Sequence, residues 1–163
     1  MKTVYLVRHA KSKQDPTYTQ DFERPLTKRG KEDAADLGGW LREHGLMPDL
    51  IISSPAKRAR QTTEQCVKAG KLTCPVRYEP SLYVHGEKAY LETMATLDDT
   101  IGSVMLVGHN PDISLLVERL SGAYHPVPTC TLAQIDLPIE HWSHLTERQG
   151  QLRQIFVPEK KED

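Results

Sequence analysis

The chain has 163 residues, a length typical of one domain, so we expect a single domain over residues 1–163 with a solvated tail at residues 158–163. Charged residues make up 26% and hydrophobic residues 38% of the composition, which is typical of a soluble globular protein. The 21 Lys and Arg nearly balance the 22 Asp and Glu, for a net charge of −1, which predicts no general affinity for nucleic acid or an anionic membrane. Any anion chemistry must come from local clusters of charge.

Neither membrane insertion nor export is indicated. No stretch reaches the roughly 18 apolar residues of a membrane span, and the apolar run in MKTVYLVRHA is too short for a signal peptide. The three cysteines, Cys66, Cys74 and Cys130, have no CxxC spacing and are expected to be reduced thiols. A Cys66–Cys74 disulfide is the less favoured alternative. We therefore expect a cytoplasmic protein with no membrane partner and no nucleic-acid partner.

The first third of the chain predicts a strand, a loop and a helix. Residues 3–7 form a short apolar run typical of a strand, and the charged segment SKQDPTYTQDFERP has no periodicity, which indicates a surface loop. Thr27 is expected to cap a helix that runs to about His44 and ends at Gly45. Two glycines inside this helix, Gly38 and Gly39, suggest close packing against the sheet.

Strands and helices continue to alternate after the first helix. The predicted helices are residues 54–69, opened by a Ser54-Pro55 cap, and residues 87–97 and 110–120. The predicted strands are residues 50–53, 76–79, 103–107, 131–137 and 151–157, the last two at or near a sheet edge. This alternation predicts an α/β sandwich with a mainly parallel central sheet of about six strands.

Histidines and arginines follow three of these strands. The first strand ends in Arg8-His9, the second runs into a helix whose first turn holds Lys57 and Arg58, and the fourth ends before His109. Open α/β sheets bind ligands beyond the carboxyl ends of their strands, where helix N-termini favour anions. We therefore expect these side chains to converge on an anion the size of phosphate.

Each residue also has a simpler explanation. A single histidine after a strand is often only structural, and an arginine in a first helical turn is usually solvated. Such an arginine opposes the helix dipole at a cost of about 0.3–1 kcal/mol, so Arg58 is poorly placed unless an anion joins it. The coincidence at three strand ends favours the functional interpretation.

Metal and nucleotide sites are less well supported. His9 and His109 lack acidic or cysteine companions at ligand spacing, and His141 and His144 are expected to be an exposed pair. No glycine-rich phosphate loop is present in the sequence.

Four ordered motifs carry a resemblance to a known family. LVRHAKS, ERPLTKRG, PDLIISSPAKRARQT and LVGHN follow one another over nearly the whole chain. Together they resemble the histidine phosphatase superfamily, the phosphoglycerate-mutase-like proteins, and within it the SixA branch of small phosphohistidine phosphatases. The usual Arg-His-Gly signature is Arg8-His9-Ala10 here, which leaves the site intact if the backbone at Ala10 has a negative φ.

The resemblance implies a fold, an activity and a set of site residues. The fold is a three-layer α/β/α sandwich, and the reaction needs no metal and no cofactor. The nucleophilic histidine falls on His9 and its partner on His109, while the phosphate-binding arginines fall on Arg8 and Arg58. The SixA branch adds an arginine that falls on Arg24, and Ser12 is a weaker candidate for a hydroxyl contact with phosphate.

A general acid is the part of the family pattern without a clear match. Relatives that cleave phosphate esters usually carry a carboxylate after the third strand, where SLYVHGEKAYL offers only His85 and Glu87. An imidazole leaving group is far less basic than an alkoxide, so we expect no single carboxylate to be essential for phosphohistidine. A phosphorylated histidine protein is therefore the favoured substrate and partner. A general small-molecule phosphomonoesterase and a non-catalytic phosphoprotein-binding module remain alternatives.

Overall fold

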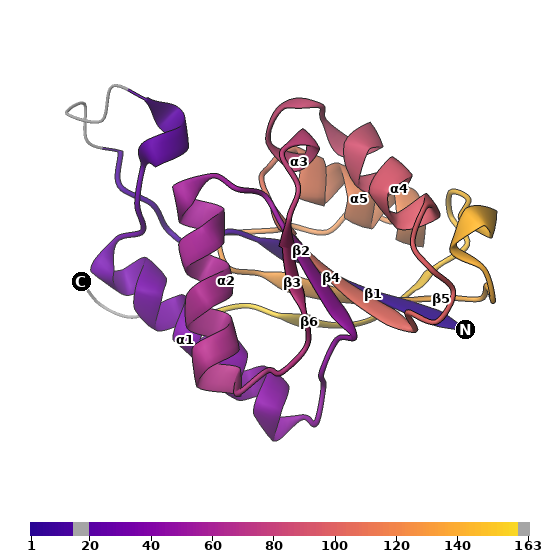
Figure 1. Ribbon diagram of the computed structural model, residues 1–163, viewed down its shortest axis with the longest axis horizontal. Helices are drawn as coiled ribbons and strands as arrows, with labels where there is room; N and C mark the ends of the chain where they lie inside the picture. Colours follow the sequence, from indigo (N-terminus) through magenta and orange to yellow (C-terminus); the bar gives the residue numbers. More distant parts are fainter. Residues whose placement is uncertain (15–19, 160–163) are drawn as a thin grey trace.

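A six-stranded sheet forms the centre of the computed structural model, which describes residues 1–14 and 20–159 (Figure 1). The strand order is β3-β2-β4-β1-β5-β6. The strands are β1 (Lys2–Arg8), β2 (Leu50–Ser53), β3 (Val76–Tyr78), β4 (Ser103–Gly108), β5 (Leu132–Leu137) and β6 (Gln151–Phe156). The pairs β1–β4, β2–β4 and β2–β3 are parallel, whereas β5 pairs antiparallel with β1 and with β6. The expectation of a mainly parallel sheet is confirmed, with an antiparallel edge.

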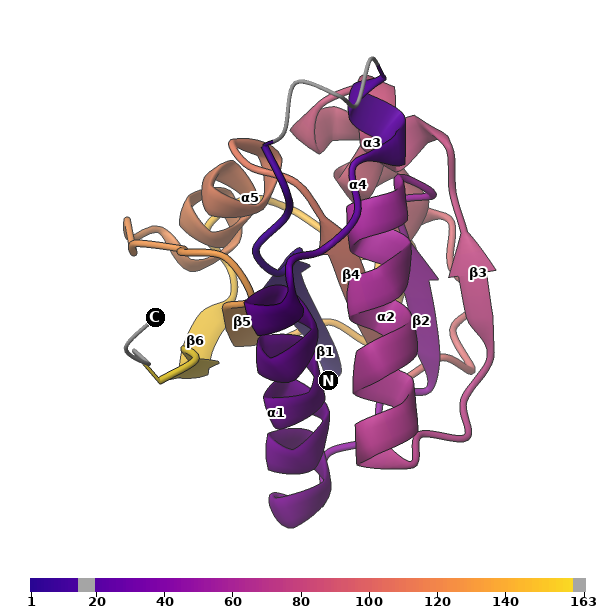
Figure 2. The same ribbon diagram turned by 90° about the vertical axis from the view of Figure 1, so that its left-hand side faces the viewer.

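Helices cover both faces of this sheet, so the predicted three-layer α/β/α arrangement is confirmed (Figure 2). On one face lie α1 (Lys28–Glu43) and α2 (Lys57–Gly70), and on the other α4 (Glu87–Ala95) and α5 (Asp112–Ser121). Successive side chains of a strand point to opposite faces. Accordingly Tyr5 and Val7 of β1 pack with the α1 and α2 layer, and Val4 and Leu6 pack with α4 and α5.

The first helix begins and ends where the sequence predicts. The hydroxyl of Thr27 accepts the N–H of Gly30 at 3.0 Å, which caps α1. Gly45 follows the helix with φ of 63°, a conformation that glycine adopts without strain.

The expected Ser54-Pro55 cap of the second helix is wrong. Helix α2 starts at Lys57 with Ala56 as its N-cap residue, and no side chain caps it. Ser54 instead directly follows β2, and its backbone N–H donates to the carbonyl of Val107 at 2.9 Å. Its hydroxyl accepts the N–H of Ala56 at 3.3 Å and lies 2.7 Å from Nε2 of His109, the residue that follows β4.

Gly38 is a position of close approach, but to a helix and not to the sheet. A Cβ atom at Gly38 would lie 2.3 Å from the carbonyl oxygen of Cys66 in α2, and one at Gly39 would meet nothing within 4 Å. The expectation of packing against the sheet is wrong because α1 and α2 lie side by side in one layer and touch along this line.

Three short helical turns lie in segments where the sequence analysis expected none. These are η1 (Asp21–Glu23), α3 (Ser81–Val84) and η2 (Trp142–His144). The turn η1 falls inside the predicted surface loop, of which residues 15–19 lie outside the described residues. Residues 160–163 of the predicted solvated tail also lie outside them. No helix in the described ranges is long and apolar enough to cross a membrane.

The cysteines are free thiols, as expected: Cys66, Cys74 and Cys130 form no disulfide.

Candidate active site

The C-terminal end of β1 places Arg8 and His9 at the edge of the sheet. The backbone N–H of His9 donates to the carbonyl of Gly108 at 2.9 Å, which fixes this end of β1 against β4. The imidazole of His9 is buried, and its Nδ1–H donates to the carbonyl of Ala10 at 2.7 Å. Because a carbonyl only accepts hydrogen bonds, this contact places the proton of the neutral ring on Nδ1 and leaves the lone pair on Nε2.

Ala10 occupies the position at which the signature usually has glycine. Its N–H donates to the Thr62 hydroxyl at 3.0 Å, and its side chain is fully buried. Within the described ranges, the non-glycine residues with positive φ are Lys71, Cys130 and Arg148. Ala10 therefore has an ordinary backbone conformation, and its methyl group causes no strain.

His109 follows β4 and is held from two sides. Its backbone N–H donates to the hydroxyl of Tyr90 at 3.3 Å, and its ring Nε2 lies 2.7 Å from the hydroxyl of Ser54. A Cβ atom at Gly108 would lie only 2.0 Å from the Tyr90 hydroxyl, so this close contact requires glycine. The rings of His9 and His109 face each other, with centroids 5.3 Å apart and planes inclined by 55°.

Arg58 lies in the first turn of α2 and binds a carboxylate that the sequence analysis did not identify. Its Nη1 donates to the backbone carbonyl of Asp21 at 2.9 Å, and its Nη2 donates to Asp21 Oδ2 at 3.0 Å. The anion that should accompany a cation at a helix N-terminus is thus supplied in part by the protein itself.

Arg24 and Arg8 complete a group of three arginines. Arg24 Nε donates to Asp21 Oδ1 at 3.0 Å, and its Nη1 donates to the hydroxyl of Ser12 at 2.9 Å. Arg8 Nη1 donates to the carbonyl of Val127 at 2.9 Å. Ser12 is thus bonded to Arg24 and lines the same cavity, and its contact with phosphate stays a prediction.

These side chains surround a cavity of about 280 Å³. Its lining residues are Arg8, His9, Lys11, Ser12, Gln14, Arg24, Arg58, His109, Asn110 and Thr129. Three buried nitrogen atoms of this lining have no hydrogen-bond partner in the described part of the chain, namely Arg8 Nε, Arg58 Nε and His109 Nδ1. Buried polar atoms are normally paired. Unpaired nitrogens that share one cavity therefore mark a place for an oxygen-rich ligand.

The surroundings keep both histidines uncharged. Burial, together with the nearby Arg58 and Arg8, lowers the pKa of His9 to about 4. Burial and the neighbouring His9 and Arg58 lower the pKa of His109 to about 3. Near neutral pH both rings are therefore neutral, and the lone pair of His9 Nε2 is available to react.

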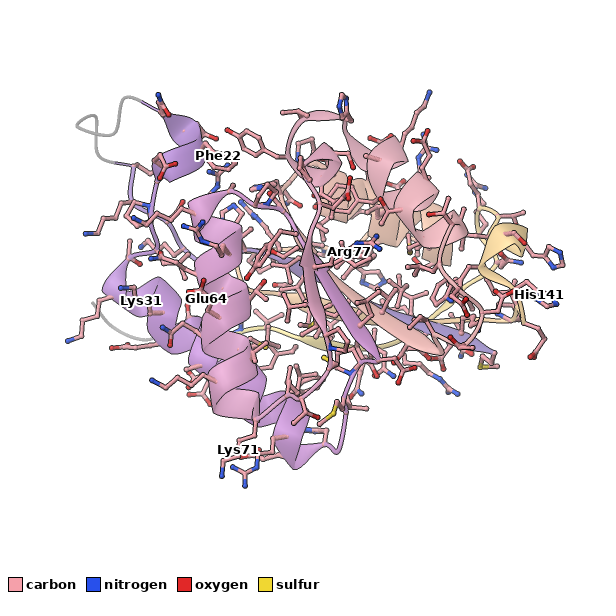
Figure 3. All side chains as sticks on the ribbon, viewed as in Figure 1. Phe22, Lys31, Glu64, Lys71, Arg77 and His141 are labelled. Carbon is pink, nitrogen blue, oxygen red and sulfur yellow. The ribbon has the colours of Figure 1, made fainter. Side chains whose placement is uncertain are left out.

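Asp21 and Tyr83 join the short helices η1 and α3 beside the arginines. The Tyr83 hydroxyl donates to Asp21 Oδ2 at 2.8 Å. The Tyr83 ring packs edge-on against two other rings, with centroid distances of 5.1 Å to Phe22 and 5.5 Å to His109. Phe22 is labelled on η1 in Figure 3. Partial burial would raise the pKa of Asp21, but the Tyr83 hydrogen bond and the Arg58 charge lower it to about 2. The QDFER segment carries one sequence feature that could have indicated this contact, because the carboxylate of Asp21 comes three residues before Arg24.

Comparisons with known proteins agree with this geometry. Residues 4–83 match the model of the histidine phosphatase superfamily (branch 1). An uncharacterised chloroplastic protein of Arabidopsis thaliana is 33% identical over 86% of this chain and 69% of its own length. A crystal structure from Agrobacterium tumefaciens, described as a SixA phosphohistidine phosphatase, superposes with a TM-score of 0.84 at 30% identity, covering 96% of this chain and 98% of that one.

The chain belongs to the histidine phosphatase superfamily. Its likeness to the Agrobacterium structure, and to the phosphohistidine phosphatase SixA of Escherichia coli, assigns it to the SixA-type branch. The Escherichia coli protein is 26% identical over 82% of this chain and 84% of its own length. Membership of this superfamily supports a phosphatase activity of the hydrolase class.

The two candidates for a general acid in this histidine phosphatase lie outside the cavity. Glu87 Oε1 lies 3.4 Å from Arg119 Nη2, and His85 is exposed; neither lines the cavity. His141 lies far from the site, near the opposite end of the molecule from Phe22 (Figure 3), and His144 lies beside it. Their rings are 5.1 Å apart, and the described residues contain no group of three side chains suited to a metal.

A larger cavity, of about 710 Å³, lies between α1 and β6 and contains none of the predicted site residues. It has neither a histidine nor an arginine in its lining, so the smaller cavity is the candidate for the phosphatase site.

Proposed function

We propose that this protein is a phosphohistidine phosphatase that removes phosphoryl groups from histidine in a signalling phosphotransfer domain or a phosphocarrier protein. The observation that carries the proposal is the pair of buried, neutral histidines that share a cavity with three arginines. Guanidinium groups match the geometry of phosphate oxygens and stay charged throughout the reaction. A purely binding module would need the arginines but not a nucleophile.

In the first step, His9 Nε2 attacks the phosphorus atom of the substrate phosphohistidine. The new N–P bond forms as the substrate N–P bond breaks, and the bonding electron pair leaves with the substrate imidazole, which takes up a proton. In the second step, water attacks the phosphorus of phosphorylated His9, and inorganic phosphate and neutral His9 result. Both steps follow the general scheme of covalent catalysis.

Arg8 and Arg58 stabilise the phosphoryl oxygens in both steps, and Arg24 binds the substrate phosphate beside them. Phosphoryl transfer spreads negative charge over three equatorial oxygens, so positioned cations supply much of the rate. His109 donates to the same oxygens from Nδ1 when the Ser54 hydroxyl donates to its Nε2. With these donors in place, we propose that the reaction needs no metal and no cofactor.

The choice of substrate rests on the leaving group. His85 and Glu87 lie outside the cavity, so neither supports the protonation of a basic alkoxide. An imidazole is a far better leaving group than an alkoxide.

We propose that the protein acts in the cytoplasm, a reducing compartment that suits its free cysteines.

One comparison of substrates tests this proposal. Turnover is measured on a histidine protein phosphorylated chemically with phosphoramidate and on p-nitrophenyl phosphate, with His9→Ala as the blank. We expect the phosphohistidine protein to be turned over with the higher kcat/KM. A preference for the ester would identify a small-molecule phosphomonoesterase, and binding without turnover of either compound would identify a phosphoprotein-binding module.

A further inference from the structure

We propose that Asp21 is a positioning residue of the phosphate site, which holds the guanidinium groups of Arg58 and Arg24 in the orientation that receives the phosphoryl oxygens. This inference rests on the proposed function, because it concerns how the same site binds the transferred group.

Asp21 uses both its carboxylate and its backbone to hold the two arginines. Oδ2 accepts Arg58 Nη2 at 3.0 Å and Oδ1 accepts Arg24 Nε at 3.0 Å. The backbone carbonyl accepts Arg58 Nη1 at 2.9 Å and the backbone N–H of Arg24 at 3.1 Å. Asp21 therefore binds two guanidinium groups that come from different parts of the chain. The Ser12 hydroxyl and the Lys13 carbonyl hold Arg24 with it.

The carboxylate holds the arginines without filling the place of the phosphoryl group. Asp21 is not among the residues that line the cavity, although both arginines are. It takes the two terminal nitrogens of Arg58 and leaves the buried Nε without a partner. Arg8 and His109, which also line the cavity, likewise have a buried nitrogen without a partner in the described part of the chain, Arg8 Nε and His109 Nδ1. Asp21 thus orients the donors from outside the cavity.

Tyr83 in turn holds the carboxylate in place. Its hydroxyl donates to Asp21 Oδ2 at 2.8 Å, and its ring lies 6.0 Å from the Arg58 guanidinium carbon. The side chain of Asp21 is 53% exposed, so without these partners water would compete for it. This hydrogen bond between α3 and η1 keeps Asp21 beside both arginines.

Orientation of this kind affects the rate more than the binding of a ground-state anion. Donors that are already aimed at developing charge need no reorganisation during the reaction. The low pKa of Asp21 keeps it ionised over the whole working range, so its hold on the arginines does not depend on protonation near neutral pH.

The test compares Asp21→Asn with Glu23→Gln, which removes the other carboxylate of the same short helix. Asparagine keeps the shape and the backbone contact but loses the charge that holds the guanidinium groups. We expect kcat to fall at least about tenfold for Asp21→Asn, because loss of one positioned donor typically costs about 10²–10³. The Glu23→Gln control should stay within about twofold. A fall of less than tenfold for Asp21→Asn would overturn the proposal.

A double-mutant cycle separates positioning from a merely structural role. If Asp21 acts through Arg58, the combined loss in Asp21→Asn/Arg58→Lys should be at least about threefold smaller than the product of the two single losses. A combined loss that equals the product of the two single losses within threefold would overturn the proposal.

Each kcat is measured on p-nitrophenyl phosphate as well as on the phosphohistidine protein. If the parent protein hydrolyses only the ester, the proposed substrate is wrong, yet the ester data still decide the role of Asp21. Calorimetric binding of inorganic phosphate to each variant checks that the site has folded.

Discussion

The Nδ1–H of His9 donates to the carbonyl oxygen of Ala10 at 2.7 Å, a contact between adjacent residues in the chain. It sets the tautomer of the ring locally, so the direction of the reactive lone pair does not depend on a distant carboxylate. The nitrogen available for reaction is Nε2.

The first prediction concerns the covalent intermediate. Rapid quenching with labelled substrate should trap an acid-labile, alkali-stable phosphoenzyme on Nε2 of His9, and His9→Ala should abolish it. His109→Ala is the matched control, because it removes the facing ring and leaves the nucleophile in place. A label that survives in His9→Ala and vanishes in His109→Ala would reverse the two roles.

The second prediction concerns Arg58. Arg58→Lys should lower kcat by about 10²–10³, because lysine keeps a charge but loses the planar set of donors. The control is Arg60→Lys in the same helix, whose side chain is 44% exposed and lies 3.8 Å from Glu64. The kcat of this control, measured by steady-state kinetics, should stay near the parent value. Near-parent activity of Arg58→Lys would contradict a role of the Arg58 guanidinium in binding phosphate and direct attention to Lys57.

The third prediction concerns the missing acid. Glu87→Gln and His85→Ala should leave phosphohistidine turnover within about tenfold of the parent, since general acid catalysis typically contributes about 10²–10⁴-fold where it operates. Both side chains lie outside the cavity. A loss of a hundredfold or more with the fold intact would indicate an esterase with its acid in this segment.

The fourth prediction concerns stability in acid. His9 has an ordinary pKa of 6.5 when unfolded and about 4 when folded, so between these values the unfolded chain binds more protons. The free energy of unfolding should therefore fall as the pH drops from 6.5 to 4, at a limiting slope of about 1.4 kcal/mol per pH unit from His9. Urea unfolding across this range should show a smaller decline for His9→Gln, which cannot be protonated. Equal declines would contradict the buried, neutral state.

The fifth prediction uses two neighbouring glycines of α1. Gly38→Ala should destabilise the fold by about 1–3 kcal/mol, because its new methyl group would collide with the carbonyl of Cys66. Gly39→Ala should instead stabilise it by up to about 1 kcal/mol through helix propensity, since nothing lies within 4 Å. Thermal melts of the two variants should shift in opposite directions. A shift of both in the same direction would contradict the close helix contact.

The sequence predicted what depends on local patterns. The strand at residues 50–53 matches β2 exactly as expected from its apolar run, and the Thr27 cap marks the start of α1. The short α3, only four residues long, is below the length at which a periodic pattern can be recognised. Ser54 was misassigned because a serine before a proline is typical of a helix cap, whereas its hydroxyl accepts the N–H of Ala56 before the helix begins and lies 2.7 Å from His109 Nε2, a contact between remote residues.

The candidate site was predicted in part for the same reason. His9, His109, Arg8 and Arg58 follow strand ends, and the parallel sheet brings strand ends together. Asp21 was not identified because two of its three partners are remote in the chain, 37 residues away at Arg58 and 62 residues away at Tyr83, and an acidic residue three positions before Arg24 is common in a charged loop. No local pattern reveals the two remote contacts.

Gly108 and Tyr90 constrain each other's evolution. The phenol hydroxyl occupies the space that any side chain at position 108 would need, and the same hydroxyl accepts the N–H of His109 and donates to the carbonyl of Leu82 at 2.9 Å. A larger residue at 108 would expel the phenol, and loss of the phenol alone would leave buried polar groups unpaired. Neutral drift at either position is therefore blocked. In relatives the two positions should be inherited as a pair, or be replaced together with a new support for the second histidine.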